Sequence, residues 1–489
     1  MRQGIAFKTT AAWLLITMVP GIRMRAEVPA AKATPARPLA KVRVAADGRG
    51  FETAPGRTFA PVGVNYFRPG TGWAPKVWQT FDPEATRRDF QVMRGLGVNC
   101  VRVFLTLGSF YAQPGRLGPE ALAKFDRFLE IAERHGIYVH PTGPDHWEGL
   151  PAWARGDRIA RESFLAAMET FWRLFARRYR GRPVIFAYDL LNEPSVPWTA
   201  ADLRPKWTAW LKDQYGSLER IKEAWPVADL PQRIEQVTIP PPEQAITPQQ
   251  RLDYQHFRES VADEWTRRQA AAIKEVDPQA LVTVGMIQWS VPTLLPRADV
   301  YSAFRPQRQA RFLDFLSVHF YPLDGGAYGY EGRETELRNL AYLESVVLEV
   351  ARAGKPVVIG EFGWYGGGKP RFNRGRPPAA TEQQQAQWCR RVMETTAPLA
   401  CGWLNWGLYD HPEARDVTEL TGLLTSDGRL KAWGRQFQAV AETYRRHRRP
   451  PDGLPDRPTI DWDRCITDVR AGHAFREAYQ KAFRSDHRD

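Results

Sequence analysis

Short apolar runs alternate with longer amphipathic segments along most of the chain, beginning near residue 58. Between the runs, apolar positions recur three or four residues apart, as at Leu122, Phe125, Leu129 and Ala132, which predicts helices with one apolar face. Strand-like runs that alternate with such helices are typical of parallel β/α units. The runs occupy residues 59–66, 98–105, 136–142, 183–191, 280–287, 314–321, 356–362 and 400–408.

Eight runs are the number that a closed (β/α)8 barrel requires. A doubly wound sheet shows the same alternation, but no glycine-rich phosphate-binding fingerprint follows the first run. Asp82 and Pro83 form a helix-start pair, and Gly136 is a helix-stop signal. We therefore predict an α/β protein whose main domain, residues 41–445, is a TIM barrel.

Three segments fall outside the repeat. Residues 40–57 read as a hairpin that can close the bottom of the barrel. Residues 196–250 are too long for a plain connection. Because this insertion follows the C-terminal end of a strand, we expect its aromatic residues to wall the functional cleft. Residues 446–489 begin basic and proline-rich and end in a short helical stretch, which predicts a tail. The aromatic residues are Trp198, Trp207, Trp210, Tyr215 and Trp225.

The N-terminus resembles a secretory signal peptide over residues 1–30. Arg2 and Lys8 precede a short apolar core at residues 11–19, and small residues follow at 28–30. The apolar core is too short to span a bilayer comfortably. Arg23 and Arg25, just after the core, leave an uncleaved anchor open. We expect a protein that is secreted, periplasmic or held at the cell envelope, with no membrane span apart from such an anchor.

The composition is that of a packed globular protein, with 43% hydrophobic and 25% charged residues and 18 tryptophans in 489 residues. A net charge of +13 would suit nucleic acid, but no basic run interleaved with aromatics is present. A solvated basic surface is the preferred interpretation. The four cysteines lack metal or redox spacing, and Cys100 and Cys401 lie in strand-like contexts that predict buried thiols.

Two glutamates stand at strand ends. Glu193 follows the apolar run "PVIFAYDLL", and Glu361 lies in "PVVIGEF". In a β/α barrel the C-terminal strand ends point into one cleft, so the two carboxylates should face each other. Pro194 lacks an N–H and stops the first of these strands. A lone strand-end glutamate is as often a salt bridge or loop cap, but a facing pair suits glycosidic cleavage by one protonated and one ionised carboxyl.

Polar neighbours surround this pair. Asn192 can hydrogen-bond a sugar 2-hydroxyl, and Arg102 can hold Glu361 ionised through its positive charge. His319 and Tyr321 alternate along one strand and so face the same side. Tyr321 can bond Glu361, while His319 contacts the substrate or the acid unless it is a core histidine.

One aromatic residue and two histidines are further candidates. Trp406 can form the floor of a sugar pocket by stacking, or else belongs to the barrel core. His140, Asp145 and His146 do not form a recognisable metal-binding set, so we expect no metal and no cofactor.

The ordered set of strand-end motifs resembles the family 5 glycoside hydrolases, the cellulase and β-mannanase family. The motifs are "VRVF", "LNEP", "HFYP", "GEFGW" and a tryptophan in the last strand. The resemblance implies Glu193 as acid/base and Glu361 as nucleophile. It also implies a histidine after the third strand, for which we favour His146, beside Trp147, over His140. The supporting residues would be Arg102, Asn192, His319, Tyr321 and Trp406.

The expected function is a retaining β-glycosidase that acts on a β-linked polysaccharide or oligosaccharide, of the mannan or glucan type. The insertion is similar to the corresponding region of family 42 β-galactosidases, so an exo-acting β-galactosidase-like or β-mannosidase-like enzyme is the first alternative. The second is a barrel that binds carbohydrate without cleaving it, for which two facing carboxylates are not needed.

Overall fold

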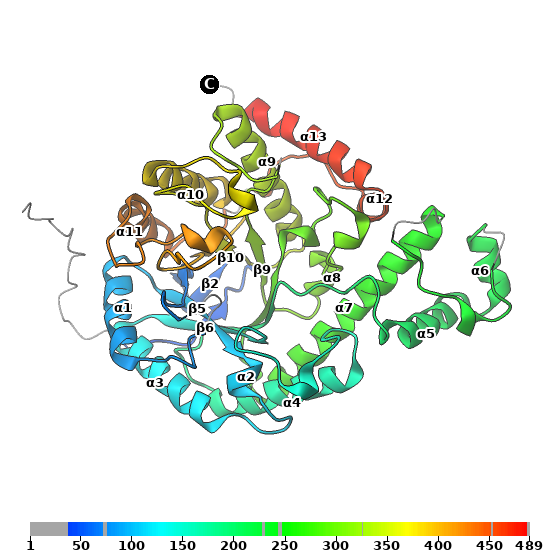
Figure 1. Ribbon diagram of the computed structural model, residues 1–489, viewed down its shortest axis with the longest axis horizontal. Helices are drawn as coiled ribbons and strands as arrows, with labels where there is room; N and C mark the ends of the chain where they lie inside the picture. Colours follow the sequence, from blue (N-terminus) through cyan, green and yellow to red (C-terminus); the bar gives the residue numbers. More distant parts are fainter. Residues whose placement is uncertain are drawn as a thin grey trace, which may run out of the picture.

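The computed structural model describes residues 38–71, 76–226, 230–242, 247–324, 326–450 and 453–486. Eight parallel strands close into a barrel inside a ring of helices (Figure 1). The predicted TIM barrel is confirmed, and each apolar run coincides with one strand. The predicted signal peptide, residues 1–30, lies outside the described residues. The strands are β4 (Val62–Asn65), β5 (Cys100–Thr106), β6 (Tyr138–Asp145), β7 (Tyr188–Asn192), β8 (Val282–Met286), β9 (Leu316–Phe320), β10 (Val357–Phe362) and β11 (Trp403–Asn405).

The surrounding helices begin and end at the signals that the sequence carries. Asp82 caps the first helix by accepting from the N–H groups of Glu84 (2.9 Å) and Ala85 (3.1 Å). Gly136 ends the third helix with φ of 69°, a left-handed conformation that suits glycine. The ring contains α1 (Pro83–Gly95), α2 (Leu107–Phe110), α3 (Pro119–His135), α4 (Glu162–Tyr179), α7 (Pro248–Val276), α8 (Pro306–Gln309), α9 (Arg333–Ala351), α10 (Glu382–Thr396) and α11 (Ala432–Tyr444).

Single-turn 3-10 helices interrupt the connections. No helix among the described residues is both long enough and apolar enough to cross a membrane. The 3-10 helices are η1 (Ala152–Ala154), η2 (Ile234–Gln236), η3 (Gln288–Ser290), η4 (Ala298–Val300), η5 (Asn373–Gly375) and η6 (Val417–Glu419).

A small antiparallel sheet closes the bottom of the barrel, where the strands begin. Phe51 packs edge-on against Phe186 and Phe315, with ring centroids 5.1 and 5.2 Å apart. Cys100 and Cys401 belong to the same buried cluster and are free thiols, as predicted. Burial of such apolar side chains stabilises the fold by about 1.5–3 kcal/mol each. The sheet consists of β1 (Arg43–Val44), β2 (Phe51–Ala54) and β3 (Arg57–Phe59).

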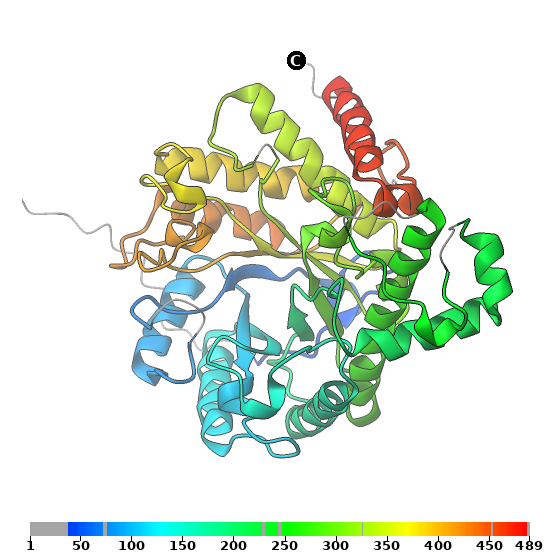
Figure 2. The same ribbon diagram turned by 45° about the vertical axis from the view of Figure 1, so that its right-hand side comes forward.

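The insertion after β7 forms α5 (Leu203–Tyr215) and α6 (Leu218–Ala224). Trp207 stacks between Trp210 and Trp225, at 5.3 and 6.1 Å, and its edge contacts Tyr254 of α7. In both views these helices lie to the side of the barrel, beyond α7 (Figures 1 and 2). The structure thus differs from the prediction that these aromatics wall the cleft, because the rings mainly bury one another.

The C-terminal segment packs on the barrel as α12 (Trp462–Thr467) and α13 (Val469–Asp486). These helices contact α7 and α9 respectively (Figure 1). Arg305, at the start of α8, lies 4.6 Å from the ring of Trp462. Tyr479 donates to Glu344 Oε1 of α9 over 2.9 Å. The two helices therefore cover the flank of the barrel between α7 and α9.

Candidate active site

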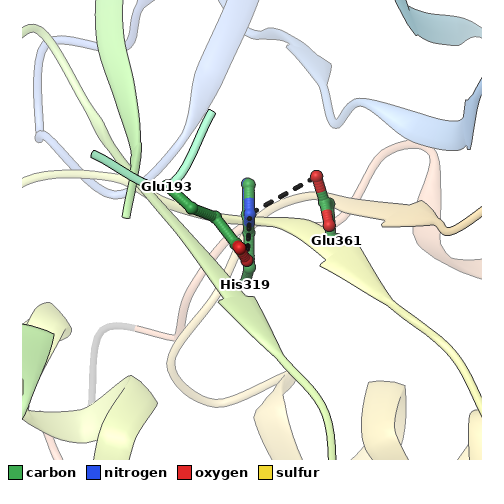
Figure 3. Close-up of side chains that lie close together, drawn as sticks. All are labelled: Glu193, His319 and Glu361. Atoms are coloured by element: carbon green, nitrogen blue, oxygen red, sulfur yellow. Dashed lines mark hydrogen bonds and ion pairs between the residues drawn. The ribbon is translucent and has the colours of Figure 1, made fainter. Parts of the chain in front are cut away.

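The two predicted carboxylates meet at the mouth of the barrel. Glu193 directly follows β7, and Glu361 lies near the end of β10. His319 of β9 stands between them, with Nδ1 3.1 Å from Glu193 Oε1 and 3.4 Å from Glu361 Oε1 (Figure 3). One side-chain donor atom from each of the three residues lies within 4.8 Å of the others. The fold therefore brings together two glutamates that are far apart in the sequence.

Arg102 organises the floor of this site. Its guanidinium is fully buried, and Nη1 donates to Glu361 Oε1 over 2.7 Å. Nε and Nη2 both donate to Asp189 Oδ2, at 2.9 and 2.8 Å. Nη2 also donates to Asn192 Oδ1, and Nη1 to Asn65 Oδ1, each over 2.9 Å. A buried charge persists only when it is paired and hydrogen-bonded, and this one has two carboxylates and two amides.

Asp189 and Asn65 are site residues that the sequence analysis missed. Asp189 is fully buried, and its second oxygen, Oδ1, accepts from the Gly285 N–H over 2.8 Å. The sequence could have indicated Asp189 by its position, because a charged residue inside an apolar strand needs a buried partner. Asn65 stands at the end of β4 and donates to the Gly360 carbonyl oxygen over 3.0 Å. Together they fix Arg102, which in turn holds Glu361.

Two glycines make room for these side chains. A Cβ at Gly285 would lie 2.9 Å from both Arg102 Nη2 and His319 Nε2. A Cβ at Gly360 would lie 2.3 Å from Ser317 Oγ and 3.1 Å from His319 Nε2. Glycine is therefore required at Gly285 and Gly360 by close approach rather than by backbone conformation.

The backbone at Glu193 is strained. Its φ of 47° places a non-glycine residue in the left-handed region, immediately before Pro194. Its N–H donates to the Gly285 carbonyl oxygen over 2.8 Å, which ties this conformation to β8. Such strain costs about 1–3 kcal/mol and concentrates at functional sites. Here it directs the carboxyl group toward His319.

The two carboxyls have different electrostatic surroundings. Burial raises the pKa of Glu193 to about 7, and the nearby charge of Arg102 only partly offsets this. Burial also raises the pKa of Glu361, but His319 and Arg102 oppose the rise. In addition, Tyr321 OH donates to Glu361 Oε2 over 3.0 Å. Hydrogen-bond donors favour the ionised form, so Arg102 and Tyr321 stabilise the Glu361 carboxylate.

His319 is neutral near pH 7, because burial lowers its pKa to about 4. It is 1% exposed. A neutral ring carries one N–H, and Nδ1 is the ring nitrogen that faces both carboxyls. His319 can therefore donate to whichever carboxyl is ionised.

Trp406 lies at the end of β11 with 6% of its surface exposed. Its Nε1 donates to Thr418 Oγ1 over 2.8 Å. The ring tilts against Phe67 at 5.0 Å and meets the edge of Phe104 at 6.0 Å. The side chain is thus held rigidly by its neighbours.

The two candidate histidines occupy different places. His140 is fully buried, its Nδ1 lies 2.8 Å from the Ala187 carbonyl oxygen, and its ring packs against Phe186 of the bottom cluster. The side chain of His146 is 44% exposed and stacks on Trp147 at 4.6 Å. Of the two, His146 is the one that a ligand can reach.

Glu193, His319 and Glu361 are close enough for one metal ion to bind all three. Glu361, however, already accepts from Arg102 and Tyr321. The guanidinium charge beside it disfavours a second cation at the same oxygens. The donor set therefore fits proton exchange between carboxyls and a ligand better than metal binding.

The sequence comparisons match this chain to glycoside hydrolases. A sequence model described as Cellulase (glycosyl hydrolase family 5) matches residues 53–411. The β-xylosidase of Phanerodontia chrysosporium is 28% identical over 148 residues, which cover 28% of this chain and 29% of that protein. The mannan endo-1,4-beta-mannosidase F of Aspergillus clavatus is 23% identical over 184 residues, or 32% and 42% of the two chains. The matches thus span less than half of these relatives' lengths.

Solved structures share the fold at low identity. A GH5_18 variant from Streptomyces cattleya in complex with Manβ1-4GlcNAc has a TM-score of 0.59 and 21% identity, covering 87% of this chain and 92% of that one. An exo-beta-1,4-mannosidase from an Opitutaceae bacterium gives 0.55 and 18%, covering 82% and 62%. A beta-galactosidase from Halorubrum lacusprofundi gives 0.62 and 18%, covering 84% and 62%. At these identities the likeness concerns the fold alone.

Proposed function

Because the chain belongs to the cellulase family, glycosyl hydrolase family 5, we propose that it cleaves β-glycosidic bonds with retention of configuration. The observation that best supports this proposal is the short distance between the two carboxyl groups. One oxygen of Glu193 and one oxygen of Glu361 lie within 4.8 Å of each other. Retaining glycosidases hold their carboxyl groups roughly 5–5.5 Å apart, whereas inverting ones need about 6.5–9.5 Å to admit a water.

In the first step, ionised Glu361 attacks the anomeric carbon while protonated Glu193 gives its proton to the departing oxygen. The glycosidic bond breaks and a Glu361–sugar ester forms. In the second step Glu193 takes a proton from water, the water oxygen attacks the same carbon, and Glu361 leaves as a carboxylate. Two inversions at one carbon give net retention. The raised pKa of Glu193, about 7, supports its role as the acid, and the hydrogen bonds from Arg102 and Tyr321 support Glu361 as the ionised carboxyl.

The neighbouring side chains have supporting roles in this proposal. Arg102 and Tyr321 hold Glu361 in place and favour its charge. Asn192 has its Oδ1 fixed by Arg102, which leaves its amide N–H groups for a sugar 2-hydroxyl. His319 assists Glu193 when that carboxyl is ionised. His146 and Trp406 contact the sugar ring from the edge and floor of the site.

We propose a β-mannoside, within a β-linked oligosaccharide or polysaccharide, as the substrate. The mannosidases among the sequence relatives and solved structures support this choice. A β-galactoside is the second candidate, because a beta-galactosidase is among the matching solved structures. Glucan chains are a third class to test, since the family name is that of the cellulases.

The test is proton NMR of the anomeric signals during hydrolysis of manno-, gluco- and galacto-oligosaccharides. We expect the β-anomer to appear first and the α-anomer only later, by mutarotation. The Glu361→Ala variant should produce neither. First release of the α-anomer would rule out retention, and a folded protein that binds but cleaves none of the panel would favour the non-catalytic alternative.

We also propose that the protein is exported, on the basis of the signal-like residues 1–30. Mass spectrometry of the protein recovered from the medium or periplasm of an exporting host should show an N-terminus near residue 30. Retention of the full chain in the cytoplasm would contradict export, and an intact N-terminus in the membrane fraction would indicate the uncleaved anchor.

A further inference from the structure

A cavity of about 260 Å³ lies between the insertion and the barrel, away from the carboxyl pair. Three helices meet there: α5 of the insertion, the first half of α7, and the one-turn α8. The lining residues are Trp210, Gln214, Asp253, His256, Ser260 and Arg308. None of them takes part in the site described above.

Helical spacing gathers these side chains on facing surfaces. Trp210 and Gln214 are four residues apart on α5 and so share one face. Asp253, His256 and Ser260 follow at intervals of three and four on α7 and form the opposite face. The cavity is therefore a consequence of how two regular helices pack.

Trp210 offers an aromatic side chain to the cavity. Its ring is nearly parallel to that of Trp207, at 14° and 5.3 Å, so one face is covered and the ring is held flat. The residue is half-buried, and it lines the cavity. Aromatic faces bind apolar C–H surfaces such as those of pyranose rings, and a pre-fixed indole loses little entropy on binding.

The charged residues of the lining are already paired or hydrogen-bonded within the protein. Arg308 donates to Asp263 over 2.6 Å, which offsets its charge. Asp253 accepts from Tyr215 OH (2.5 Å), Trp225 Nε1 (2.6 Å) and Gln249 Nε2 (2.9 Å). The lining charges are thus already engaged within the protein, which disfavours an ionic ligand and suits a neutral one.

Three lining groups retain capacity for hydroxyls. The Gln214 carboxamide is exposed and makes no hydrogen bond to a described residue. His256 Nε2 lies 3.1 Å from Asp463 Oδ1, so a neutral ring that donates there leaves Nδ1 to accept. Ser260 Oγ donates to the Phe257 carbonyl oxygen over 2.7 Å and can still accept.

We propose that this cavity is a non-catalytic binding site for one neutral sugar ring of a glycan chain. The volume lies just below the roughly 300–1,000 Å³ of sites for drug-sized ligands, which suits a single ring. The inference rests on the proposed function only for its ligand class, a glycan. The site tethers the polymer to the side of the barrel, independently of the cleft.

The test uses the full chain with Glu361→Ala, which does not degrade its ligand, in native gels containing soluble glucomannan, barley β-glucan or xylan. We expect at least one polymer to retard the protein. Adding Trp210→Ala should weaken the retardation about tenfold, the loss expected for one stacking contact. Gln214→Ala, an exposed change, should weaken it about threefold. Tyr444→Ala, which removes a half-buried aromatic at the bottom of the barrel, is the control and should have no effect.

A second measurement separates this site from catalysis. With Glu361 intact, Trp210→Ala should hydrolyse a small aryl glycoside at the parent rate but slow the hydrolysis of the retarding polymer. If Trp210→Ala and Gln214→Ala weaken the retardation but the parent cleaves no substrate, the binding site is supported and the proposed glycosidase function is not. If no polymer retards the protein, or if the parent and both variants are retarded equally, the proposed sugar-binding site is wrong. If Trp210→Ala lowers the melting temperature severely, Gln214→Ala alone decides.

Discussion

The two ends of the barrel use the same strands for opposite purposes. At the mouth, Arg102, Asp189 and Glu361 are buried charges joined by hydrogen bonds of 2.7–2.9 Å. At the bottom, Phe51 and its neighbours form an apolar plug. Val358 and Glu361, three residues apart in β10, belong to the bottom and the mouth respectively. Apolar packing at the bottom stabilises the fold and has no role in ligand specificity. Burial of charges at the mouth costs free energy, which the packing at the bottom helps to offset.

The bottom also carries positive charge, but for another reason. Four arginines, Arg57, Arg94, Arg445 and Arg446, are among the residues that line a cavity of about 670 Å³ there. Arg94 stands in the last turn of α1, and Arg445 caps α11. Helix C-termini bear partial negative charge, which these cations offset. Part of the +13 net charge is thus a structural complement to the helices.

The largest effect should come from Glu361→Ala at the mouth. It removes the proposed nucleophile, so kcat/KM should fall by at least about 10⁴-fold, measured with an aryl β-mannoside. Glu52→Ala at the bottom removes an ion pair with Arg43 and is the matched control, expected to stay within twofold. A loss of less than tenfold for Glu361→Ala would place the nucleophile elsewhere.

Asp189→Asn should affect both stability and rate. It removes one of the two carboxylates that compensate Arg102, and breaking a buried pair costs about 3–5 kcal/mol. Urea denaturation should show this decrease, and kcat should fall because Arg102 no longer holds Glu361 in one position. Unchanged stability would mean that Glu361 alone compensates the guanidinium.

Phe51→Ala should lower stability while leaving catalysis intact. Removing the ring leaves a cavity among Phe186 and Phe315, which should reduce the free energy of unfolding by roughly 3 kcal/mol. The kcat/KM of the folded protein should remain within twofold of the parent value. A fall in kcat/KM without a fall in stability would show that the two ends are coupled.

Glu193→Gln should change the pH profile. Glu193 must be protonated to act as the acid, and burial raises its pKa to about 7, so kcat/KM should decline above that pH. In Glu193→Gln, tested on a substrate with a good leaving group, this upper limb should vanish. Persistence of the limb would assign the acid to another residue.

The smallest effect is on stability. Burial raises the pKa of Glu193 in the folded protein from its ordinary value of about 4.5 to about 7, so the parent protein loses stability as the pH rises from about 4.5 through 7. In Glu193→Gln the side chain does not titrate, so this pH-dependent loss of stability is absent. It should therefore gain about 1–2 kcal/mol relative to the parent at pH 8, less than the full shift implies because the side chain is 27% exposed. Equal differences in stability at pH 4.5 and pH 8 would contradict the raised pKa.

The fold was predictable because each strand and helix has a local signal, from apolar runs to the Asp82 cap. Glu193 and Glu361 were predictable because strand-end positions share one edge. Asp189 was missed because only the folded barrel shows that it faces Arg102. The insertion was misread because buried and ligand-binding tryptophans have the same sequence pattern, and only packing shows that Trp207 is internal. The φ of Glu193 depends on tertiary contacts that no local motif encodes.

The packing of α12 and α13 has a consequence for synthesis. Every barrel strand leaves the ribosome before residues 462–486 do, yet these residues cover the flank between α7 and α9. During translation that flank, including the partners of Trp462 and Tyr479, faces the cytosol or the export machinery uncovered. A nascent chain halted before residue 462 should therefore remain protease-sensitive and available to chaperones, and release of α12 and α13 becomes the event that covers this flank.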